Sequence, residues 1–354
     1  MSKIRILFMS LVDASSLNAQ SLNTREIVLR LDPNRFECSL FYAQEPDPRL
    51  LNQPHIKLVR LPARLKTVRL LREMLSGYDI IAYMDYSPAS YLFLHSPKIL
   101  RKRAKAVMHV EGLSEIGKQP TMLTFLYKGT VPRCDFYTGI TERSAQHFNS
   151  VWHRDVLCIL PVGVDHQAFS LSRNNRNGSL VVLFVGTLVK RKEPLLVVEA
   201  AARFPQIKFR MIGPDRHGYE QVVRDRIAEL KISNVVIEGS KSQADTARAM
   251  QESDVFLLPA RNEGLPKVTL EAAACGLPCI VFRDYETPSV VDGVTGFQVN
   301  TSEEMMEKLG LLLENAQLRE SMGNAGRKLA ERFEWDSVAK LWQDAYLRIA
   351  STRA

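Results

Sequence analysis

Residues 255–282 spell VFLLPARNEGLPKVTLEAAACGLPCIVF, and this stretch decides the fold. Its two apolar runs, Val255–Leu258 and Cys279–Phe282, have the length and composition of buried strands. Between them, Pro266 suits the first position of a helix, and Gly276 suits the residue just beyond the last turn. The stretch therefore predicts a strand–helix–strand unit of a parallel sheet.

The start of this predicted helix lies at the carboxyl edge of the sheet, where α/β folds bind anionic ligands. A helix that begins at Pro266 offers the amides of Lys267 and Val268 to such a ligand at its positive end. Glu263 lies just before the helix and Glu271 about two turns inside it, so both carboxylates can border one cleft. A phosphate site beside two carboxylates predicts a ligand that carries a diphosphate and several hydroxyls.

The ordered run EGLPKVTLEAAACGLPCIV, with the later VVDGVTGF, resembles the donor-binding segment of glycosyltransferase family 4. That family is retaining, uses nucleotide sugars and has the GT-B fold. The resemblance implies an α/β protein with two Rossmann-like parallel-sheet domains that face each other across a cleft. It places an acceptor-binding domain at 1–165, a nucleotide-sugar-binding domain at 166–330 and a helix that crosses back to the first domain at 331–354.

Strand-like and helical segments alternate along the whole chain, as such a fold requires. Strand-like Ile4–Phe8 and Cys38–Tyr42 flank the helical segment Thr24–Leu31. In the second half, Lys208–Ile212 and Asn234–Glu238 are strand-like and stand between helical segments. This alternation predicts parallel sheets covered by helices.

Composition agrees with an ordinary globular protein, since 45% of the 354 residues are apolar and 24% are charged. The five cysteines are scattered and form no C-x-x-C pair, which favours a reduced, cytoplasmic setting. We interpret the opening MSKIRILFMSLVDA as a first strand and not as a signal peptide. No apolar run approaches the ~20 residues of a membrane-spanning helix.

The net charge of +8 is concentrated in the first half of the chain. Residues 1–165 carry 22 Lys and Arg against 15 Asp and Glu, an excess of +7. The basic residues cluster in 57–72 and 98–105. Within the first cluster, in the segment Arg64–Leu75, we expect an apolar helical stripe formed by Leu65, Val68, Leu71 and Leu75.

One interpretation of the two basic clusters is that both are solvated helix faces. The other is a surface attracted to the anionic inner face of a membrane, with peripheral localisation. The absence of interleaved aromatics argues against nucleic acid as a partner.

Family resemblance also assigns residues in the first domain. The paired glycines that approach the donor phosphates in the family fall on Asn18 and Ala19 here, which is a departure from the family pattern. The strand Ala104–Val110 ends in a context, AVMHVEG, that resembles the family's strand-end histidine. The resemblance therefore implies a catalytic His109 that faces the donor sugar.

In the second domain the family's two diphosphate-binding cations fall in the turn GTLVKRKEP. The usual arginine position is Thr187, whereas Lys192 stands at the lysine position. We expect Arg191 to supply the missing cation, because the departing β-phosphate carries charge that must be neutralised. The alternative is a solvated basic turn.

Other donor contacts follow from the same resemblance. Glu271 is expected on the ribose, and Glu263 on the transferred sugar together with the adjacent Gly264 and Leu265. The nucleobase region is expected at the turns that close two strands, Gly213-Pro214 and Gly239-Ser240.

No metal site or cofactor is expected. The seven histidines are dispersed, and no Asp-x-Asp motif occurs. The resemblance implies metal-independent transfer of a hexose, with retention, from a nucleotide diphosphate to a lipid-linked or polysaccharide acceptor. Two alternatives stay open: a non-catalytic sugar-nucleotide-binding partner, and a nucleotide-sugar epimerase on the same fold. A glycoside hydrolase would also use two carboxylates but has no need of a diphosphate site.

Overall fold

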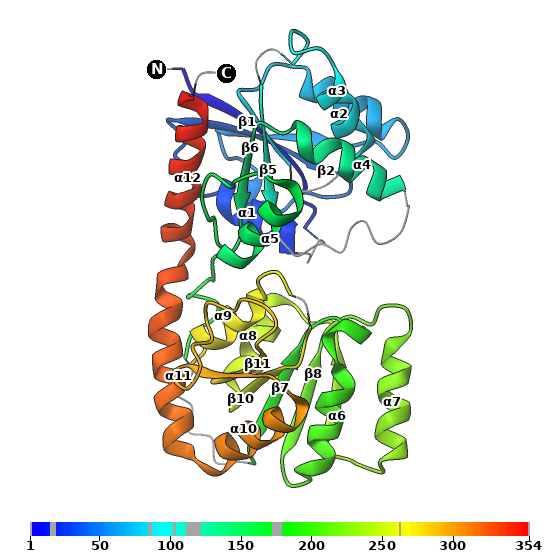
Figure 1. Cartoon of the computed structure of the whole chain (residues 1–354), viewed down its shortest axis with the longest axis vertical. Coiled ribbons are helices and arrows are strands. Elements are labelled where there is room, and N and C mark those ends of the chain that lie inside the picture. Colours follow the sequence, from blue (N-terminus) through cyan, green and yellow to red (C-terminus); the bar gives the residue numbers. More distant parts are fainter. Residues whose placement is uncertain are drawn as a thin grey trace. The chain divides into compact units, whose positions relative to one another are not determined.

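The structure is a computed structural model that describes residues 2–14, 19–83, 87–101, 104–110, 122–171, 179–261 and 263–352. The chain divides into two compact units. Unit 1 comprises Met1–Val162 and Trp335–Ala354, and unit 2 comprises Gly163–Glu334. Each unit has a six-stranded sheet with helices on both faces (Figure 1). The predicted α/β class with two Rossmann-like parallel sheets is confirmed.

Unit 1 has the strand order β3-β2-β1-β4-β5-β6, and every pairing in it is parallel. Its strands are β1 (Ile4–Leu11), β2 (Phe36–Tyr42), β3 (Ile56–Arg60), β4 (Ile80–Tyr83), β5 (Lys105–Val110) and β6 (Phe136–Gly139). Its helices are α1 (Ala19–Val28), α2 (Lys66–Met74), α3 (Pro88–His95), α4 (Met122–Thr130), α5 (Glu142–Trp152) and α12 (Trp335–Ser351). The 3₁₀ turns are η1 (Pro48–Leu50) and η2 (Val131–Arg133).

Unit 2 repeats this topology, with the order β12-β11-β10-β7-β8-β9. Its strands are β7 (Val181–Val185), β8 (Lys208–Ile212), β9 (Val235–Gly239), β10 (Val255–Leu258), β11 (Cys279–Phe282) and β12 (Gly296–Val299). Its helices are α6 (Pro194–Arg203), α7 (Tyr219–Glu229), α8 (Gln243–Gln251), α9 (Lys267–Ala274), α10 (Ser302–Glu314) and α11 (Ala316–Ala330), with 3₁₀ turns η3 (Lys190–Lys192) and η4 (Glu331–Phe333).

Strand order reverses between β7 and β10 in unit 2, because β7 leads to β8 on one side while β10 leads to β11 on the other. In open α/β sheets such a reversal leaves a crevice at the carboxyl ends of the two strands. All residues of β10 and β11 are buried, as expected for central strands covered on both faces.

Helix ends follow the local sequence closely, with one correction. Thr141 caps α5 by accepting a hydrogen bond from the amide of Ser144, and Gly276 follows α9 with φ +75°. Pro266, however, is the N-cap of α9 and not its first residue. Its ψ of 98° is extended and not helical. The helix therefore begins at Lys267.

The predicted apolar stripe of α2 is wrong at two of its four residues. Leu65 is 74% exposed and Val68 is 60% exposed, whereas Leu70 and Met74 are buried. Leu65 is the N-cap of α2 with φ 61°, so it stands outside the helical register that we assumed. Leu71 and Leu75 are partly buried against the core, so the expected stripe holds for these two residues and fails for Leu65 and Val68.

Two members of the predicted basic clusters bind other parts of unit 1. Lys57 pairs with the buried Glu73 at 2.5 Å. Lys105 donates to the carbonyls of Ile349, Ala350 and Thr352 at 2.8, 2.7 and 2.5 Å. Cations are favourable at the carboxyl end of a helix, so Lys105 stabilises the end of α12. The charge of Lys57 is thus paired with a buried carboxylate, and that of Lys105 is bound by backbone carbonyls.

The described residues include no helix that is both long and apolar enough to cross a membrane.

Candidate active site

Two loops at the reversal of strand order in unit 2 carry the charged residues predicted to hold the donor. The η3 turn follows β7 and contains Arg191 and Lys192, and the loop after β10 contains Glu263. The amide of Arg261 donates to the carbonyl of Arg191 at 2.9 Å, which joins the two loops. The reversal of strand order thus brings together residues that lie about 70 positions apart in the sequence.

Small residues let these loops approach each other. A Cβ on Gly186 would lie 3.6 Å from Cδ of Lys192, so the lysine stem passes over this glycine. A Cβ on Gly213 would lie 2.0 Å from the carbonyl oxygen of Gly186, which no side chain could tolerate. Gly213 also has φ +152°, so glycine is required there on both counts.

Both cations meet the same carboxylate oxygen. Lys192 Nζ lies 2.9 Å from Oε1 of Glu263, and Arg191 Nη1 pairs with this same atom. Lys192 and Glu263 are largely buried, whereas about half of the Arg191 side chain is exposed. Burial lowers the pKa of Lys192, and Glu263 opposes that shift. The cluster carries two positive charges and one negative charge, which suits it to an anion.

The second predicted carboxylate lies on α9. Glu271 Oε1 is 3.5 Å from Lys267 Nζ, one helical turn away. Burial raises the pKa of Glu271, and Lys267 only partly opposes this shift. The structure thus places the two glutamates in separate ion pairs, one in the loop before α9 and one inside the helix. Val268, Gly264 and Leu265 lie in or just before the first turn of this helix.

The predicted nucleobase turns lie beside the cation turn. The amide of Gly213 donates to the carbonyl of Gly239, and the amide of Leu188 donates to the carbonyl of Pro214, each at 2.9 Å. Pro214 and Ser240 are exposed at the same edge of the sheet. The turns after β7, β8 and β9 are therefore linked by their backbones.

In unit 1, His109 lies on β5 and is 5% exposed. Its Nδ1 is 2.6 Å from Thr138 Oγ1, and its Nε2 is 3.0 Å from the Tyr346 hydroxyl. The ring lies 4.7 Å from that of Trp342 on α12. Burial lowers the pKa of His109 to about 3. The ring is therefore neutral and held by hydrogen bonds to both nitrogens, and its predicted catalytic role stays a prediction.

Asn18 lies outside the described residues, and Ala19 begins α1. The loop predicted to approach the donor phosphates from unit 1 therefore stays a prediction.

Sequence reasoning missed Arg261 and the loop after β11. The guanidinium of Arg261 lies 3.3 Å from the centre of the Phe282 ring, and Nη1 is 3.3 Å from Asp284 Oδ2. This arrangement fixes the loop that carries Glu263 to the end of β11. The signal was weak, since Arg261 lies within the deciding stretch but matches no motif.

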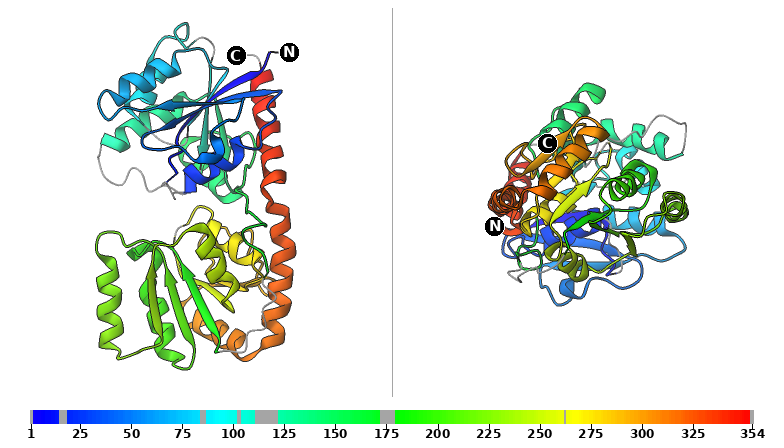
Figure 2. Two further views of the ribbon diagram at one scale, coloured as in Figure 1. Left: turned by 180° about the vertical axis from the view of Figure 1, so that it is seen from behind. Right: turned by 90° about the horizontal axis from the view of Figure 1, so that it is seen from below.

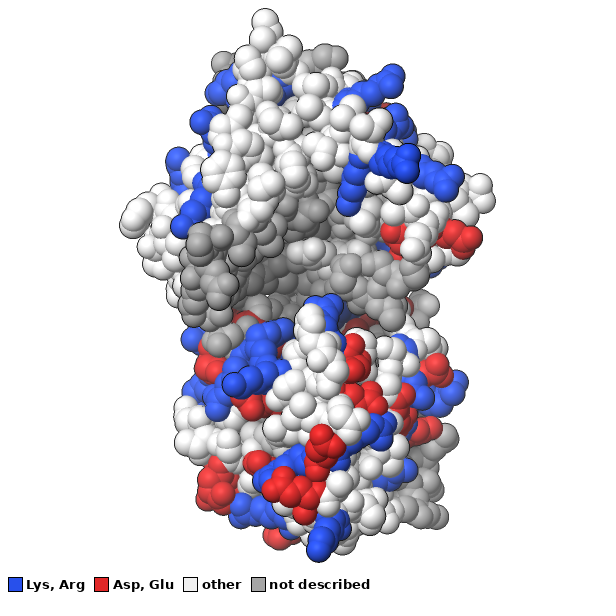
Figure 3. Space-filling model, turned by 90° about the vertical axis from the view of Figure 1, so that its right-hand side faces the viewer, with Lys and Arg blue, Asp and Glu red and all other residues white. Residues whose placement is uncertain are grey.

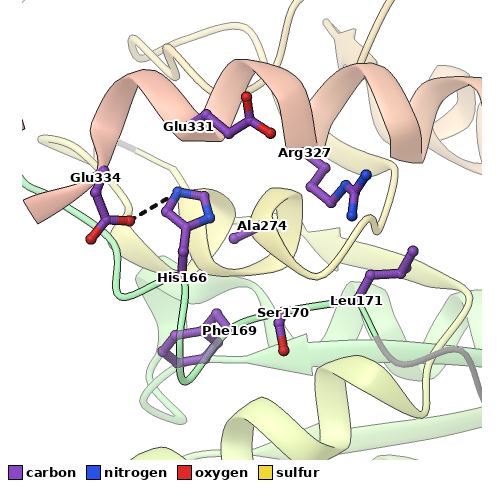
Figure 4. Close-up of a pocket in the computed structure, with 8 residues that line it drawn as sticks. All are labelled: His166, Phe169, Ser170, Leu171, Ala274, Arg327, Glu331 and Glu334. Atoms are coloured by element: carbon purple, nitrogen blue, oxygen red, sulfur yellow. Dashed lines mark ion pairs between the residues drawn. The ribbon is translucent and has the colours of Figure 1, made fainter.

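A cavity of about 360 Å³ lies elsewhere in unit 2 (Figure 4). The described residues that line it come from the start of unit 2 and from the region of α9, α11 and η4: His166, Phe169, Ser170, Leu171, Ala274, Arg327, Glu331 and Glu334. None of these belongs to the predicted donor site. In the described ranges, no group of three or more His, Cys, Asp or Glu side chains could hold a metal ion.

Comparison with known families matches residues 167–329 to the glycosyl transferases group 1. The match makes up a little under half of the chain. The match covers β7 to α11, and so the linked turns, Arg191, Lys192, Glu263 and Glu271 all lie within the glycosyltransferase domain. The family inferred from the sequence is confirmed.

Curated relatives are similar over parts of their length. An uncharacterized glycosyltransferase of Methanocaldococcus jannaschii is 28% identical over 169 residues, which are 46% of this chain and 47% of the relative. A GDP-mannose-dependent phosphatidylinositol monomannoside mannosyltransferase of Corynebacterium glutamicum is 29% identical over 250 residues, 64% of this chain and 61% of the relative. The chain thus spans about half the length of the curated relatives that it matches.

Solved structures are similar over nearly the whole chain. Anabaena HepE in complex with UDP and glucose has a TM-score of 0.80 at 17% identity, covering 98% of this chain and 100% of that one. Sucrose-phosphate synthase from Thermosynechococcus elongatus has a TM-score of 0.81 at 17% identity, covering 98% and 99%. At this level of identity the likeness shows the fold alone, and the predicted GT-B fold is confirmed.

Proposed function

We propose that the protein transfers a hexose from a nucleotide diphosphate to an acceptor hydroxyl, with retention and without a metal ion. The observation that carries the proposal is the meeting of Arg191, Lys192 and Glu263 where the strand order reverses. Two cations at this edge suit a diphosphate. A carboxylate on the same cluster suits the hydroxyls of the sugar attached to it.

The reaction balances without a cofactor. The acceptor oxygen attacks the anomeric carbon on the face from which the diphosphate departs. The bond between that carbon and the β-phosphate oxygen breaks, and the acceptor proton passes to the departing phosphate. The negative charge that develops on this phosphate is the largest electrostatic change in the step, so preorganised cations lower its barrier.

Individual roles follow from position. Lys192 and Arg191 stabilise the departing diphosphate, together with the first turn of α9 at Lys267 and Val268. Glu263, with Gly264 and Leu265, orients the sugar. Glu271 accepts hydrogen bonds from the ribose, and the turns Gly213-Pro214 and Gly239-Ser240 border the base. We retain His109 as an orienting residue for the sugar.

Similar proteins guide the choice of substrates. The HepE structure contains UDP and glucose, and the Corynebacterium relative is named for GDP-mannose and a phosphatidylinositol monomannoside. We therefore propose a UDP- or GDP-hexose donor and a lipid-linked or polysaccharide acceptor, used in cell-surface glycan synthesis at the cytoplasmic face of a membrane.

Two measurements test the proposal. A thermal-shift screen with UDP- and GDP-sugars identifies the donor, which should raise the melting temperature. Release of free nucleoside diphosphate is then measured with candidate acceptors, with and without a chelator, and the anomeric configuration of the product is read by NMR. We expect release that needs an acceptor, is unaffected by chelator and gives a product with the anomeric configuration of the donor.

The same assay separates the alternatives. An epimerase converts the donor sugar but releases no nucleoside diphosphate, and a non-catalytic binding partner shows a thermal shift and no conversion. Loss of turnover on chelation would reject the metal-independent scheme, and an inverted product would reject the retaining one.

A further inference from the structure

Helices α2, α3 and α4 lie next to one another on one side of the unit 1 sheet, in front and rear views alike (Figures 1 and 2). Helix α2 packs against α3, and α3 packs against α4. A Cβ on Gly129 would lie 2.3 Å from the Tyr91 ring, so glycine on α4 allows the close approach of α3. The rings of Tyr91 and Phe125 are 5.3 Å apart. The three helices thus present a continuous surface, here called the α2–α4 surface.

Large apolar side chains are exposed on this surface. Seven of the sixteen exposed large hydrophobic residues in the described ranges lie in its helices and the turns beside them, each between 51% and 85% exposed. They are Leu65, Val68, Leu92, Ile99, Leu100, Met122 and Phe125. Scattered exposed apolar residues are ordinary, but a gathering of this kind marks an interaction site.

Leu65 shows that folding alone does not account for this surface. It is exposed and also has a left-handed backbone, with φ 61°. A branched side chain at such a position is strained, and asparagine or glycine would be favoured there. Leucine at this position therefore gains neither from burial nor from backbone conformation.

The charge of the same surface has one sign. Among described residues 62–75, 87–101 and 122–130, the sole acidic residue is Glu73, which is buried and paired with Lys57. The basic residues in these ranges are Arg64, Lys66, Arg69, Arg72, Lys98, Arg101 and Lys128. On the side of unit 1 that faces the viewer in Figure 3, Lys and Arg flank an area of uncharged residues.

We infer that the α2–α4 surface docks on an anionic lipid bilayer. Apolar side chains that enter the interface, surrounded by Lys and Arg beside the head groups, are the two components of interfacial membrane binding. A protein partner with an acidic surface would match the charge but would not need so many apolar side chains presented on separate helices. The inference rests on the proposed function and adds a partner to it. Docking of the α2–α4 surface would hold the enzyme at the membrane that carries a lipid-linked acceptor.

The test measures binding of the full chain to vesicles, without donor, so it stands apart from any test of transfer. Sedimentation is compared between vesicles of phosphatidylcholine and vesicles that also contain 30% phosphatidylglycerol, in low and high salt. We expect binding to the anionic vesicles, weak binding to the neutral ones, and weakening by salt.

Three variants separate the apolar contribution to vesicle binding from the electrostatic contribution. Leu65→Asn with Val68→Ser removes two exposed apolar groups and relieves the strained backbone, and should weaken partitioning about tenfold or more. Phe125→Ser on α4 should weaken it by a similar factor. Lys66→Gln with Arg72→Gln should weaken binding about fivefold for each charge removed. The control is Val222→Ser with Leu311→Ser, two exposed positions in unit 2, which should bind like the unmodified chain.

Each of several outcomes would overturn the inference. These are equal binding to neutral and anionic vesicles, unchanged binding by the apolar variants, or equal losses in the unit 2 control. Circular dichroism and melting temperature show whether each variant is folded. Self-association in gel filtration that the Leu65 and Phe125 variants abolish, without vesicle binding, would assign the surface to a second copy of the chain instead.

Discussion

The two units have the same strand order but use the carboxyl ends of their strands differently. In unit 2 the loops at this edge leave Arg191, Lys192 and Glu263 in a charged cluster that a ligand can join. In unit 1 the comparable strand-end residue, His109, has both ring nitrogens occupied by Thr138 and Tyr346. The fold supplies the position, and the side chains decide how many polar atoms remain available at that position.

The strongest test of this contrast is the removal of Lys192. Lys192→Ala should slow transfer by about 10²–10³-fold, or ~2–4 kcal/mol, because the departing diphosphate loses a preorganised cation. Initial rates of nucleoside diphosphate release measure the effect. Lys190→Ala changes an exposed lysine in the same η3 turn and should leave the rate within about twofold. Unchanged activity in Lys192→Ala would remove it from the mechanism.

The stability of the two units should depend on pH with opposite sign at the two buried groups, His109 in unit 1 and Glu271 in unit 2. The pKa of His109 falls from 6.5 to about 3 on folding, so its contribution to stability is complete above pH 6.5 and is lost as the pH falls toward 3. Between pH 7.5 and 4.5 unit 1 should lose about 2–3 kcal/mol from this group. In unit 2 the sign is reversed, because the pKa of Glu271 is raised, so its contribution is present below pH 4.5 and is lost as the pH rises.

The chain offers a selective probe for this prediction. All three tryptophans, Trp152, Trp335 and Trp342, belong to unit 1, so their fluorescence follows its unfolding in urea. His109→Gln should flatten the dependence on pH, whereas His153→Gln, at an exposed position, should not. Hydrogen exchange of β10 and β11 reports on unit 2. If the unfolding free energy of unit 1 depends on pH equally in His109→Gln and in the unmodified chain, other groups cause the loss of stability in acid.

Paired tyrosine substitutions compare the two interiors. Tyr346→Phe leaves His109 Nε2 without its hydroxyl partner and should cost about 1–2 kcal/mol of unit 1 stability. Tyr285→Phe in unit 2 removes a buried hydroxyl that has no hydrogen-bond partner in the described structure, so it should be neutral or stabilising. Urea unfolding and calorimetry measure the two effects. If Tyr346→Phe also lowers transfer at constant donor affinity, the orienting role of His109 gains support.

The smallest effect concerns Glu263, which occupies both cations in the structure. Glu263→Gln should increase affinity for a free nucleoside diphosphate by about fivefold, or ~1 kcal/mol, because the ligand no longer competes with a carboxylate. Transfer should fall in the same variant. Titration calorimetry measures binding, with Glu229→Gln at the far end of α7 as control. Weaker binding would mean that Glu263 supports the diphosphate site.

Much of the fold was predictable because its signals are local. Strands β8, β10 and β11 have the predicted bounds, since each is an apolar run between turn residues. Residues 156–159 follow α5 and form only an isolated bridge, between Gly139 and Ile159. Gly139 is the last residue of β6, and the sequence carries no signal for where a neighbouring strand stops.

Side-chain pairing was harder to predict. The sequence indicated Lys192 and Glu263 separately through motif positions, but their shared carboxylate oxygen depends on the strand order, which joins distant loops. Lys105 appeared to belong to a basic surface, because nothing near it in the sequence indicates that it meets residues 349–352. The misjudged Leu65 has a local cause, because its left-handed backbone places it before the first turn of α2 and outside the helix.

The contact of Lys105 with the end of α12 has a practical consequence for protein production. Its ammonium group donates to three carbonyl oxygens near the end of the described chain, those of Ile349, Ala350 and Thr352. Trimming the chain before Ile349 would leave the half-buried Lys105, at the start of β5, without these carbonyl acceptors. An affinity tag joined after Ala354 leaves the acceptors in place. Fusions at this terminus should therefore be extensions and not deletions.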